Sequence, residues 1–558
     1  MRKRIKFKTY IVAALALASV FMMGACRKSK GLAEDPYAGG KSVLDINFIS
    51  KSSELDEVYG GAQMELNVRG LMKYKDNFKF YVNEIESKVV NFTDSTIRFT
   101  VPNQASTGSV WIVAEDQTFF GPVIKIAGRV AVDESFKVVN GAARLNASGA
   151  ATVYDMEQLP NGKFWLVGSF NVYEQNGTTE KPKGGITQIN AEGAYNTDDG
   201  VNFGIGATGG METIYSINRI SSGSQSGKYI VAGNFSGYNT KRTNRQYLNN
   251  ITRLDSKGFL DTVRTTAIVN PKPAETWKNA DTIPAFNGGV DGIVRKTFIF
   301  GEQIYVIGNF QNYKRIYYPN SSYDEKVFDV TRMLQLVRVN MDGSMDSTFH
   351  YNEAAHQSPR AANGTISDAI MQNDGKLILV GSFTSFNNIT ANHIVRLNLD
   401  GSVDDTFMSG SGADGDVSSI RYNATTGKIV LSGTFTSFDG HARVGVVLLN
   451  QNGSVDESFV TEKLSGGGAS FAGQLNNGKI IVAGTFNYYG AVLRQGFAIL
   501  NPDGTLAAGY NNTGGFQGRI YDMLETVSGT KSTVTFVGDI SRFNSTLPKN
   551  VLRIIISN

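Results

Sequence analysis

Short runs of alternating apolar and polar residues cover most of the chain, and turn residues separate them at intervals of roughly 8–12 positions. In the first part, such runs include Met64–Val68, Phe78–Val82 and Gly108–Val113. A period of two places successive side chains on opposite faces of a strand, and short strands with close turns are typical of a β-sandwich. We therefore predict a sandwich over residues 42–127, with Trp111 in its core.

The remainder of the chain repeats one phrase. A Gly-x-Phe triplet follows an apolar strand six times and a degenerate seventh copy reads Gly538-Asp539-Ile540; the six triplets begin at Gly168, Gly233, Gly308, Gly381, Gly433 and Gly484. The successive spacings are 65, 75, 73, 52, 51 and 54 residues, which indicates a unit of about 52 residues that is lengthened in the first three copies. Repetition at such a period is typical of an array or a propeller.

Each unit reads as four strands, as the fourth copy illustrates. Strand a leads through a turn at Gly375 into strand b, Lys376–Val380, which ends at the triplet. A variable loop, strand c (Ile394–Leu397), an Asp-Gly turn at Asp400 and strand d follow. Asp-Gly between apolar runs is a strong hairpin signal. Seven such units predict an all-β fold, with a seven-bladed β-propeller over residues 128–558.

The ends of the repeat region indicate how the ring closes. The last unit reads as strands a, b and c, with no fourth strand after Asn550–Ile556. Just before the first unit, Val132–Phe136 is identical to Val455–Phe459, which begins a strand d. We therefore predict that residues 128–139 supply the missing strand, which would remove the two exposed edges of an open ring.

The N-terminus has the pattern of an export signal. Five basic residues among the first eight precede an apolar run from Tyr10 to Ala25. The phrase Met22-Met23-Gly24-Ala25-Cys26 resembles a bacterial lipobox, and the resemblance implies cleavage after residues 1–25 and a diacylglycerol group on Cys26. An ordinary signal peptide or an uncleaved anchor is the alternative. Residues 26–41 are polar and Gly-rich, which predicts a flexible tether.

Composition narrows the function classes. The chain has 558 residues, with 54 Lys and Arg against 50 Asp and Glu. Cleavage of the signal leaves 49 basic against 50 acidic residues, a net charge of −1, which gives no support for nucleic-acid binding. One cysteine excludes a disulfide framework, and four histidines argue against a His-rich metal cluster. We expect no cofactor, and no second membrane span.

Two regions resemble known families. The phrase Asp94–Pro102, followed by Thr107–Val110, resembles the IPT/TIG immunoglobulin-like family, and this resemblance covers residues 42–127. The Gly-x-Phe units with their Asp-Gly turns resemble the delta-60 repeats of Bacteroidetes propellers over residues 128–558. IPT/TIG domains act as spacers or interaction modules, so the first resemblance assigns no chemistry.

Extra length is confined to one type of connection. The insertions at 236–250, 263–289, 311–331 and 350–365 fall between strands b and c or between strand d and the next strand a. These connections share one face of a propeller, so we predict that this face carries a binding site. Tyr, Trp and Arg provide large contact areas, and the candidate contacts are Tyr238, Arg242, Arg245, Tyr247, Trp277, Tyr313, Arg315, Tyr317, Tyr318 and Tyr323. The alternative is that these aromatic side chains pack within their own loops.

No catalytic motif stands out, and we assign no catalytic or metal-binding residue. Asp346, Asp404 and Asp456 share one position of the repeat, where a carboxylate that bonds to a turn is expected. Paired glycosidase carboxylates need no fixed spacing, so a glycan- or peptide-cleaving hydrolase is the least favoured alternative. We expect a protein that is not an enzyme.

Together, the signal, the IPT/TIG-like region and the delta-60-like units resemble accessory outer-membrane lipoproteins of Bacteroidetes. The resemblance implies a lipid anchor in the outer membrane, at the cell surface, beside a SusC/SusD-like (SusCD) nutrient-uptake system, in which a TonB-dependent transporter carries a SusD-like lid. The predicted function is non-catalytic binding of oligosaccharide or peptide, docking onto that complex, or both; a structural or adhesive module is the alternative. Arg27, Lys28 and Lys30 stand where such proteins often carry acidic residues, which leaves the leaflet open.

Overall fold

The structure is a computed structural model that describes residues 44–49, 54–145, 150–175, 183–196, 200–240, 246–266, 269 and 272–557. The export signal, Cys26 and the tether lie outside these ranges. The described residues form strands, turns and short 3₁₀-helices and contain no α-helix, so the predicted all-β fold class is confirmed. Within the same ranges, no helix is long and apolar enough to cross a membrane.

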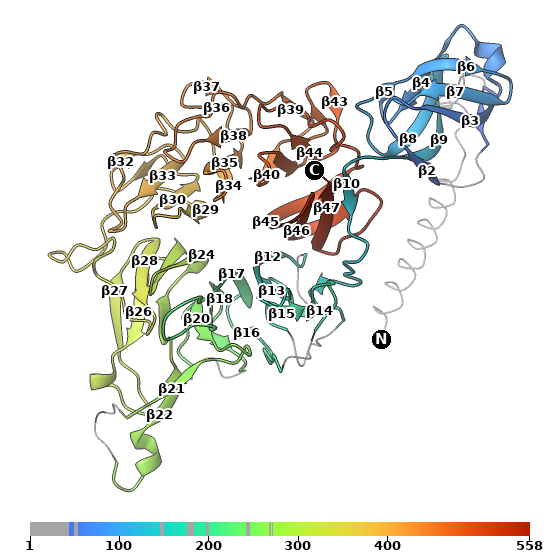
Figure 1. Ribbon diagram of the computed structural model, residues 1–558. Coiled ribbons are helices and arrows are strands. Elements are labelled where there is room, and N and C mark those ends of the chain that lie inside the picture. The colour runs from blue at the N-terminus through green and yellow to red at the C-terminus, as the bar shows by residue number, and fades with distance from the viewer. Residues whose placement is uncertain are drawn as a thin grey trace, which may run out of the picture. The chain divides into compact units, whose positions relative to one another are not determined.

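The first domain is a sandwich of two sheets, with the strand orders β1-β3-β7-β6 and β2-β9-β8-β4-β5 (Figure 1). On β3 (Gln63–Arg69), Leu66 and Val68 are buried between the sheets while their neighbours face outward. Phe80 and Phe99 meet across the two sheets, with ring centres 4.4 Å apart. The other strands are β1 (Asn47–Phe48), β2 (Glu54–Val58), β4 (Phe78–Val82), β5 (Ile85–Glu86), β6 (Lys88–Phe92), β7 (Thr96–Thr100), β8 (Gly108–Ala114) and β9 (Gln117–Ile126).

Trp111 does not lie in the core of the sandwich, so that prediction is wrong. The buried residues of β8 are Val110, Ile112 and Ala114, and alternation places Trp111 on the opposite face. There its ring stacks on Tyr81 at 5.8 Å and lies 6.2 Å from Phe120. Because β8 is apolar at successive positions, its sequence does not indicate which face is buried.

The second domain contains the repeat strands, arranged in seven sheets within the described residues. Their orders are β12-β13-β15, β17-β18-β20, β24-β25-β28, β29-β30-β33, β34-β35-β38, β40-β41-β44 and β45-β46-β47-β10. The strands are β10 (Val130–Val132), β12 (Val153–Gln158), β13 (Phe164–Gly168), β15 (Ile186–Ile189), β17 (Thr213–Arg219), β18 (Tyr229–Asn234), β20 (Ile251–Leu254), β24 (Ile293–Phe300), β25 (Gln303–Asn309), β28 (Leu336–Asn340), β29 (Ile366–Met371), β30 (Leu377–Gly381), β33 (Ile394–Leu397), β34 (Val417–Asn423), β35 (Lys428–Gly433), β38 (Val446–Leu449), β40 (Ala469–Gln474), β41 (Ile480–Gly484), β44 (Phe497–Leu500), β45 (Phe516–Ser528), β46 (Lys531–Phe543) and β47 (Val551–Ser557).

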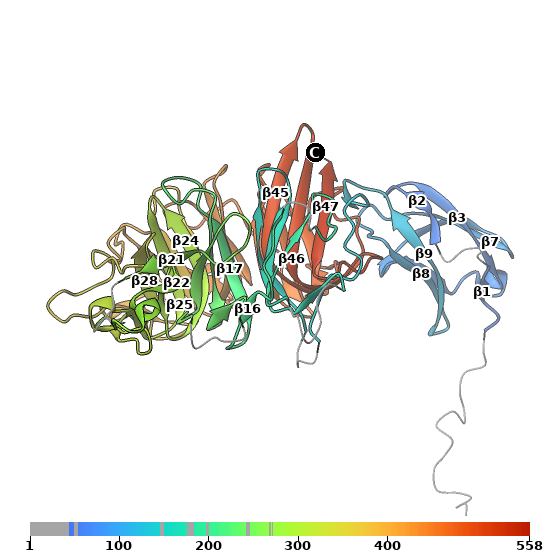
Figure 2. The same cartoon turned by 90° about the horizontal axis from the view of Figure 1, so that it is seen from below.

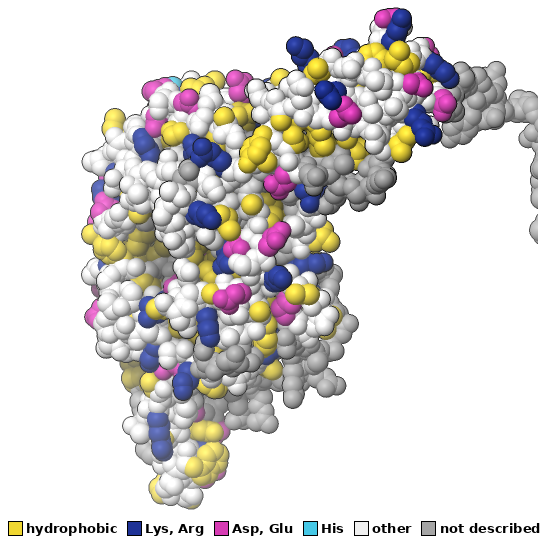
Figure 3. Space-filling model, turned by 45° about the vertical axis from the view of Figure 1, so that its right-hand side comes forward, with side chains coloured by type: hydrophobic (Ala, Val, Ile, Leu, Met, Phe, Trp, Pro, Cys, Tyr) yellow, Lys and Arg dark blue, Asp and Glu magenta, His cyan; other side chains and the backbone are white. Residues whose placement is uncertain are grey.

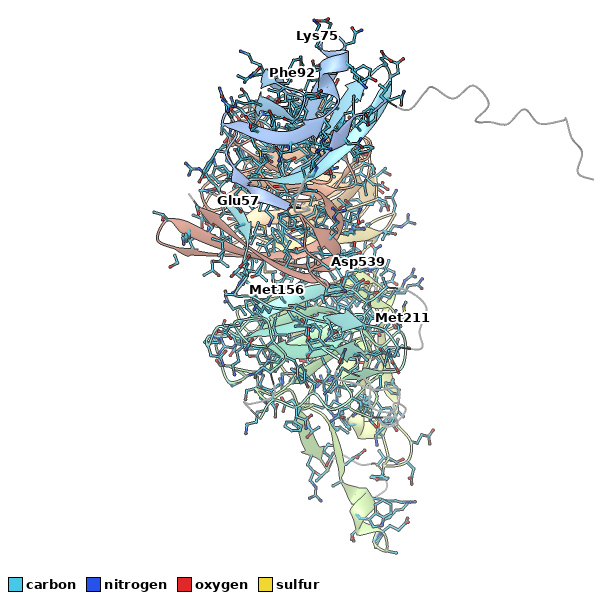
Figure 4. All side chains as sticks on the ribbon, turned by 90° about the vertical axis from the view of Figure 1, so that its right-hand side faces the viewer. Glu57, Lys75, Phe92, Met156, Met211 and Asp539 are labelled. Carbon is cyan, nitrogen blue, oxygen red and sulfur yellow. The ribbon has the colours of Figure 1, made fainter. Side chains whose placement is uncertain are left out.

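The sheets form the blades of a propeller. The first strand of each sheet contacts the first strand of the next, from β12 through β17, β24, β29, β34 and β40 to β45, and β45 contacts β12 again. These strands therefore surround the centre of the ring. β12 of the first blade also contacts β46 of the last blade, and Figure 4 labels one residue on each of these strands, Met156 and Asp539. β45 and β46, with 13 residues each, are the longest a and b strands of the described blades (Figure 2).

The glycine of each Gly-x-Phe triplet faces the backbone of strand a. A Cβ atom on Gly381 would lie 2.0 Å from the carbonyl oxygen of Thr365. The corresponding distance is 2.0–2.1 Å at Gly168, Gly233, Gly308, Gly433, Gly484 and Gly538. Any other residue would push strands a and b apart, which explains why the degenerate seventh copy keeps its glycine.

Close to this contact, every inner strand contains a β-bulge. The ladder between strands a and b skips one residue of strand a in each blade, and the skipped residues are Tyr154, Tyr215, Arg295, Ser367, Ser418, Ser470 and Tyr521. A bulge leaves its residue outside the ladder and re-aims the side chain. The repeat thus presents one side chain per blade at an equivalent position of the ring.

The predicted strand d is reduced to one bridge in six blades, where the bridged pairs are Ile189–Tyr195, Leu254–Leu260, Val339–Met345, Leu397–Val403, Leu449–Val455 and Leu500–Leu506. The residue after the bridge, which is Asp404 in the fourth blade, explains why strand d is so short. Asp404 Oδ1 accepts hydrogen bonds from the backbone N–H and the hydroxyl of Thr406, at 3.0 and 2.6 Å. This Asx-type turn directs the chain away from the ladder.

The same aspartate joins three segments of its blade. Asp404 Oδ2 accepts hydrogen bonds from Lys376 Nζ on the b side and from Arg396 Nε on strand c, both at 2.7 Å. Equivalent bonds to Arg338 and Lys428, also at 2.7 Å, are made by Asp346 and Asp456. We call this arrangement the clasp. These aspartates therefore bond a turn and a neighbouring strand, as their place in the repeat predicted.

The closing strand is present and is shorter than predicted. β10 pairs antiparallel with β47, so that Val130 lies opposite Ile556. Asp133 then accepts a hydrogen bond from Arg553 Nε at 2.7 Å, which repeats the clasp of the other blades. The predicted segment 128–139 is thus a three-residue strand followed by the clasp turn, and the ring closes between residues distant in the sequence.

Replacement of the clasp aspartate should destabilise the propeller. Asp404→Ala leaves the buried Arg396 without its carboxylate, and loss of one partner of a buried ion pair costs about 3–5 kcal/mol. We expect the free energy of unfolding in urea to fall by about this amount. The matched control is Asp405→Ala at the exposed neighbouring position, which should change it by less than about 0.5 kcal/mol. Equal effects of the two variants would contradict the clasp.

The clasp also predicts sensitivity to acid. Burial raises the pKa of the Asp404 carboxyl, but hydrogen bonds from Lys376, Thr406 and Arg396 outweigh burial and hold the pKa well below its ordinary 3.8. Between the pKa of Asp404 in the folded protein and its ordinary pKa, the unfolded chain therefore binds more protons than the folded one. The stabilisation is complete above the ordinary pKa and is lost as the pH falls through the pKa of the folded protein. The urea midpoint should decrease below about pH 4, and it should decrease less steeply in Asp404→Ala.

Candidate functional site

Two insertions fold together into one projecting structure, which we call the arm (residues 262–266, 269, 272–287 and 312–332). The insertion before the third blade forms β21 (Thr262–Thr265), the 3₁₀-helix η3 (Thr276–Asn279) and β22 (Asp281–Pro284). The insertion within that blade forms β26 (Asn312–Ile316), η4 (Tyr318–Asn320) and β27 (Phe328–Arg332). Figure 1 shows β21 and β22 beyond the outer edge of the ring.

Lys326 fastens the two insertions to each other. Its ammonium group lies 2.9 Å from Asp281 Oδ2 of the other insertion, and its side chain is only 2% exposed. The same group donates hydrogen bonds to the carbonyl oxygens of Ser322 and Tyr323, at 2.9 and 3.0 Å. Because the buried ammonium is surrounded by acceptors from both insertions, neither insertion can keep this geometry without the other.

The tip of the arm presents an aromatic pair. Trp277 on η3 is 61% exposed, and the centre of its ring lies 5.1 Å from that of Tyr323 at an angle of 81°. Lys278 Nζ lies 5.2 Å from the centre of the Trp277 ring and forms an ion pair of 3.1 Å with Asp324. The two insertions thus contribute one ring each to this surface.

Exposed apolar side chains continue along the arm. Val263, Tyr317, Phe328 and Val330 are 47%, 45%, 37% and 51% exposed. The last two lie on β27, the edge strand of the sheet β23-β26-β27, in which β23 is Gly288–Val290. Figure 3 shows a few hydrophobic side chains at the lower tip of the view, among charged and other side chains. Together with Trp277, these residues form what we call the apolar strip, and exposed apolar patches mark interaction sites.

A hollow of about 600 Å³ lies beside the arm. Tyr318 accepts a hydrogen bond from Asn287 Nδ2 at 2.6 Å, and burial raises the pKa of its phenol to about 12. Arg315 Nη2 lies 3.6 Å from Asp342 Oδ2. The hollow offers charged and hydroxyl groups to a polar ligand. Its lining includes Asn287, Arg315, Tyr318, Asp342, Arg253, Arg264 and Thr265.

The insertions extend further than predicted. They begin at the b–c and d–a connections, as the blade topology requires, but the arm runs along the outer edge of the third blade. Arg315 thereby reaches Asp342, in the c–d turn on the opposite face. The expectation that all insertions decorate one face is therefore wrong for this arm, whose strand β26 places Arg315 within 3.6 Å of that turn.

Two of the ten predicted contact residues belong to the core instead. Tyr238 is 0% exposed and donates its hydroxyl to the carbonyl oxygen of Gly258 at 3.1 Å. Tyr313 is 4% exposed and donates to the carbonyl oxygen of Gly343. Both follow the repeat glycine by five positions, where every blade buries an aromatic ring; the others are Tyr173, Phe386, Phe438, Tyr489 and Phe543. This recurrence was visible in the sequence and identifies the position as structural.

The other predicted residues are distributed between the arm and its surroundings. Arg242 and Arg245 lie outside the described residues. Tyr247 lies against the arm, with its ring centre 5.7 Å from Lys326 Nζ and 6.0 Å from the ring centre of Phe328. The tip and the hollow hold the remaining five, which are Trp277, Arg315, Tyr317, Tyr318 and Tyr323. Lys326 was not predicted, since no local pattern distinguishes it from other lysines.

Family comparisons match two regions. DUF5008, a domain of unknown function, matches residues 24–122. DUF5122, described as a beta-propeller domain of unknown function, matches residues 372–407, 425–459 and 475–506. The second match confirms the propeller, while the IPT/TIG-like nature of the first domain stays a prediction. No curated protein matches the chain.

Solved structures match the chain at low similarity. An auxiliary nutrient binding protein from Bacteroides thetaiotaomicron VPI-5482 is 10% identical, with a TM-score of 0.31 and coverage of 91% of this chain and 97% of that chain. One from Bacteroides ovatus ATCC 8483 is 12% identical, with a TM-score of 0.20 and coverage of 68% and 93%. The WD40 beta propeller domain of Doa1 is 12% identical, with a TM-score of 0.33 and coverage of 77% and 97%. At these TM-scores the likenesses carry no argument about fold or function.

Removal of the buried ammonium should loosen the arm alone. Lys326→Met keeps the aliphatic stem but leaves Asp281 without its cation, and a hydrogen bond to a charged group contributes about 1.5–3 kcal/mol. We expect limited trypsin digestion to cut within the arm several times faster, while the unfolding midpoint of the propeller is unchanged. Lys314→Met, on the neighbouring strand of the same arm, is the control. Unchanged digestion of Lys326→Met would show that the ammonium does not hold the arm.

Proposed function

We propose that this protein is a non-catalytic, lipid-anchored binding protein of the outer membrane, which docks onto a protein partner at the cell surface through the apolar strip of its arm. The partner we propose is a TonB-dependent transporter with a SusD-like lid. The observation that carries the docking role is the rigid exposure of the strip. Its aromatic and aliphatic side chains stand in solvent on a scaffold that the buried Lys326–Asp281 pair holds in place.

The composition of the strip suits a protein partner. Trp and Tyr supply most of the binding energy at many protein interfaces, because they bury a large area with few rotatable bonds. Trp277, Tyr317 and Phe328 are such residues, and ion pairs such as Lys278–Asp324 flank the tip with polar groups. A second candidate function is capture of a polar ligand in the hollow, which is favoured by the exposed Arg264 and by Arg315 in its lining.

The proposed anchor makes a direct prediction. Cys26→Ser removes the thiol that would carry the lipid, while the apolar run before it remains as a secretion signal. We expect cells grown with radiolabelled palmitate to label the wild-type protein and not the variant, because only the Cys26 thiol can carry the diacylglycerol group. Equal labelling of the two proteins, or labelling of neither, would contradict lipid anchoring at Cys26.

The docking proposal is tested by purification from the native outer membrane. The tagged protein, extracted in mild detergent, should recover a TonB-dependent transporter and its lid, identified by mass spectrometry. Trp277→Ala combined with Phe328→Ser should reduce this recovery at least about tenfold, because loss of interface aromatic residues often costs more than 2 kcal/mol. Val139→Ser, at an apolar position that is 68% exposed but outside the arm, is the control. Recovery of the wild-type protein alone would overturn the proposal.

A further inference from the structure

A second hollow, of about 440 Å³, lies at the centre of the propeller. Its wall contains the bulge residue of every blade. The other lining residues include Lys296, Asp368, Asp416 and Arg519. Thr365 and Thr434, which also line it, lie just before a strand a and just after a strand b. The hollow therefore opens on the face from which the insertions emerge. Its volume is typical of ligand pockets, which hold about 300–1,000 Å³.

One half of the wall is aromatic and cationic. The ring of Tyr154 lies 4.7 Å from that of Tyr215 and 4.9 Å from that of Tyr521. The guanidinium carbons of Arg295 and Arg519 each lie 4.9 Å from the ring centre of a tyrosine, Tyr215 and Tyr521 respectively. Stacking on an aromatic ring orients the guanidinium plane and leaves its N–H groups available for an oxyanion.

These two arginines differ from the cations beneath them. Arg421 is held by Asp368, with Nη1 2.9 Å from Oδ2. Burial lowers the pKa of Lys296, but Asp155 and Asp368 outweigh burial and raise it, so this lysine is also balanced by carboxylates. Among the described residues, by contrast, neither Arg295 nor Arg519 forms an ion pair. Within the described part of the hollow, Arg295 and Arg519 are thus arginines without a carboxylate at ion-pair distance, although Asp368 and Asp416 also belong to its wall.

The other half of the wall is hydroxylic. Ser367, Ser418 and Ser470 occupy the bulge positions of three consecutive blades. Ser418 donates its hydroxyl to the carbonyl oxygen of Ser432 at 3.2 Å, which leaves its lone pairs for a hydroxyl donor. The exposed carboxylate on this side, Asp416, lies 3.5 Å from His393 Nδ1.

We infer that the centre of the propeller binds the anionic terminal unit of an acidic saccharide, whose charged group is a carboxylate or a sulfate. The N–H groups of each arginine match a planar or tetrahedral oxyanion. The tyrosine faces suit the C–H surface of a sugar ring, and the serine oxygens can accept hydrogen bonds from the hydroxyl groups of the sugar. This site shares no lining residue with the hollow beside the arm. The inference does not depend on docking through the arm.

Calorimetric titration of the detergent-solubilised full-length protein tests this site. The probes are trigalacturonate, a sulfated carrageenan disaccharide that has no carboxylate, and neutral galactotriose. We expect at least one acidic probe to bind at least about tenfold more tightly than galactotriose, with an affinity that decreases with salt. A preference for trigalacturonate or for the sulfated disaccharide identifies the anionic group. The absence of binding by both acidic probes, or equal binding of the neutral probe, overturns the inference.

Variants place the site within the chain. Arg295→Gln and Arg519→Gln should each weaken binding of the acidic probe about tenfold or more, since each removes a charge-assisted pair. Ser367→Trp fills the hollow from its exposed rim and should abolish binding although Arg295 and Arg519 are both retained. Its unfolding midpoint should equal that of the wild type. Arg332→Gln and Trp277→Ala on the arm should bind as the wild type does. An effect of Arg332→Gln equal to that of Arg295→Gln would overturn the assignment.

Discussion

The contact between the repeat glycine and the carbonyl oxygen of strand a constrains the rest of the propeller. Because a Cβ atom at Gly381 would lie 2.0 Å from that oxygen, strands a and b approach more closely than an ordinary pair permits. The bulge lies next to this approach in every blade. One backbone constraint, repeated around the ring, therefore both packs the blades and directs one side chain per blade to the centre.

Polar residues of the repeat divide into two groups. The carboxylates of the clasp aspartates, such as Asp404, accept hydrogen bonds within their own blade and are therefore not available to bind a ligand. The bulge position is different, since it holds Tyr, Tyr, Arg, Ser, Ser, Ser and Tyr in successive blades. A scaffold that fixes the backbone of this position without fixing its side chain allows the centre of the ring to be asymmetric.

Repetition made much of the fold predictable. The triplets, the Asp-Gly turns and the five-residue identity between Val132–Phe136 and Val455–Phe459 indicated the blades and the closing strand. The sequence did not show which face of β8 is buried, because Trp111 lies between apolar neighbours. The arm was less predictable still, since the Lys326–Asp281 pair joins two insertions with no common pattern. The bulge residues at the centre of the ring could not be predicted, because a position that varies from unit to unit leaves no repeating pattern in the sequence.

The closing strand has a consequence for the order of folding. Asp133 and Arg553 are 420 positions apart, so the ring cannot close until nearly the whole propeller has been synthesised. Until then, the first and last blades keep unpaired edges, which are prone to aggregation. The two edges therefore stay exposed until synthesis is nearly complete, and truncation before Arg553 would leave a propeller that cannot close.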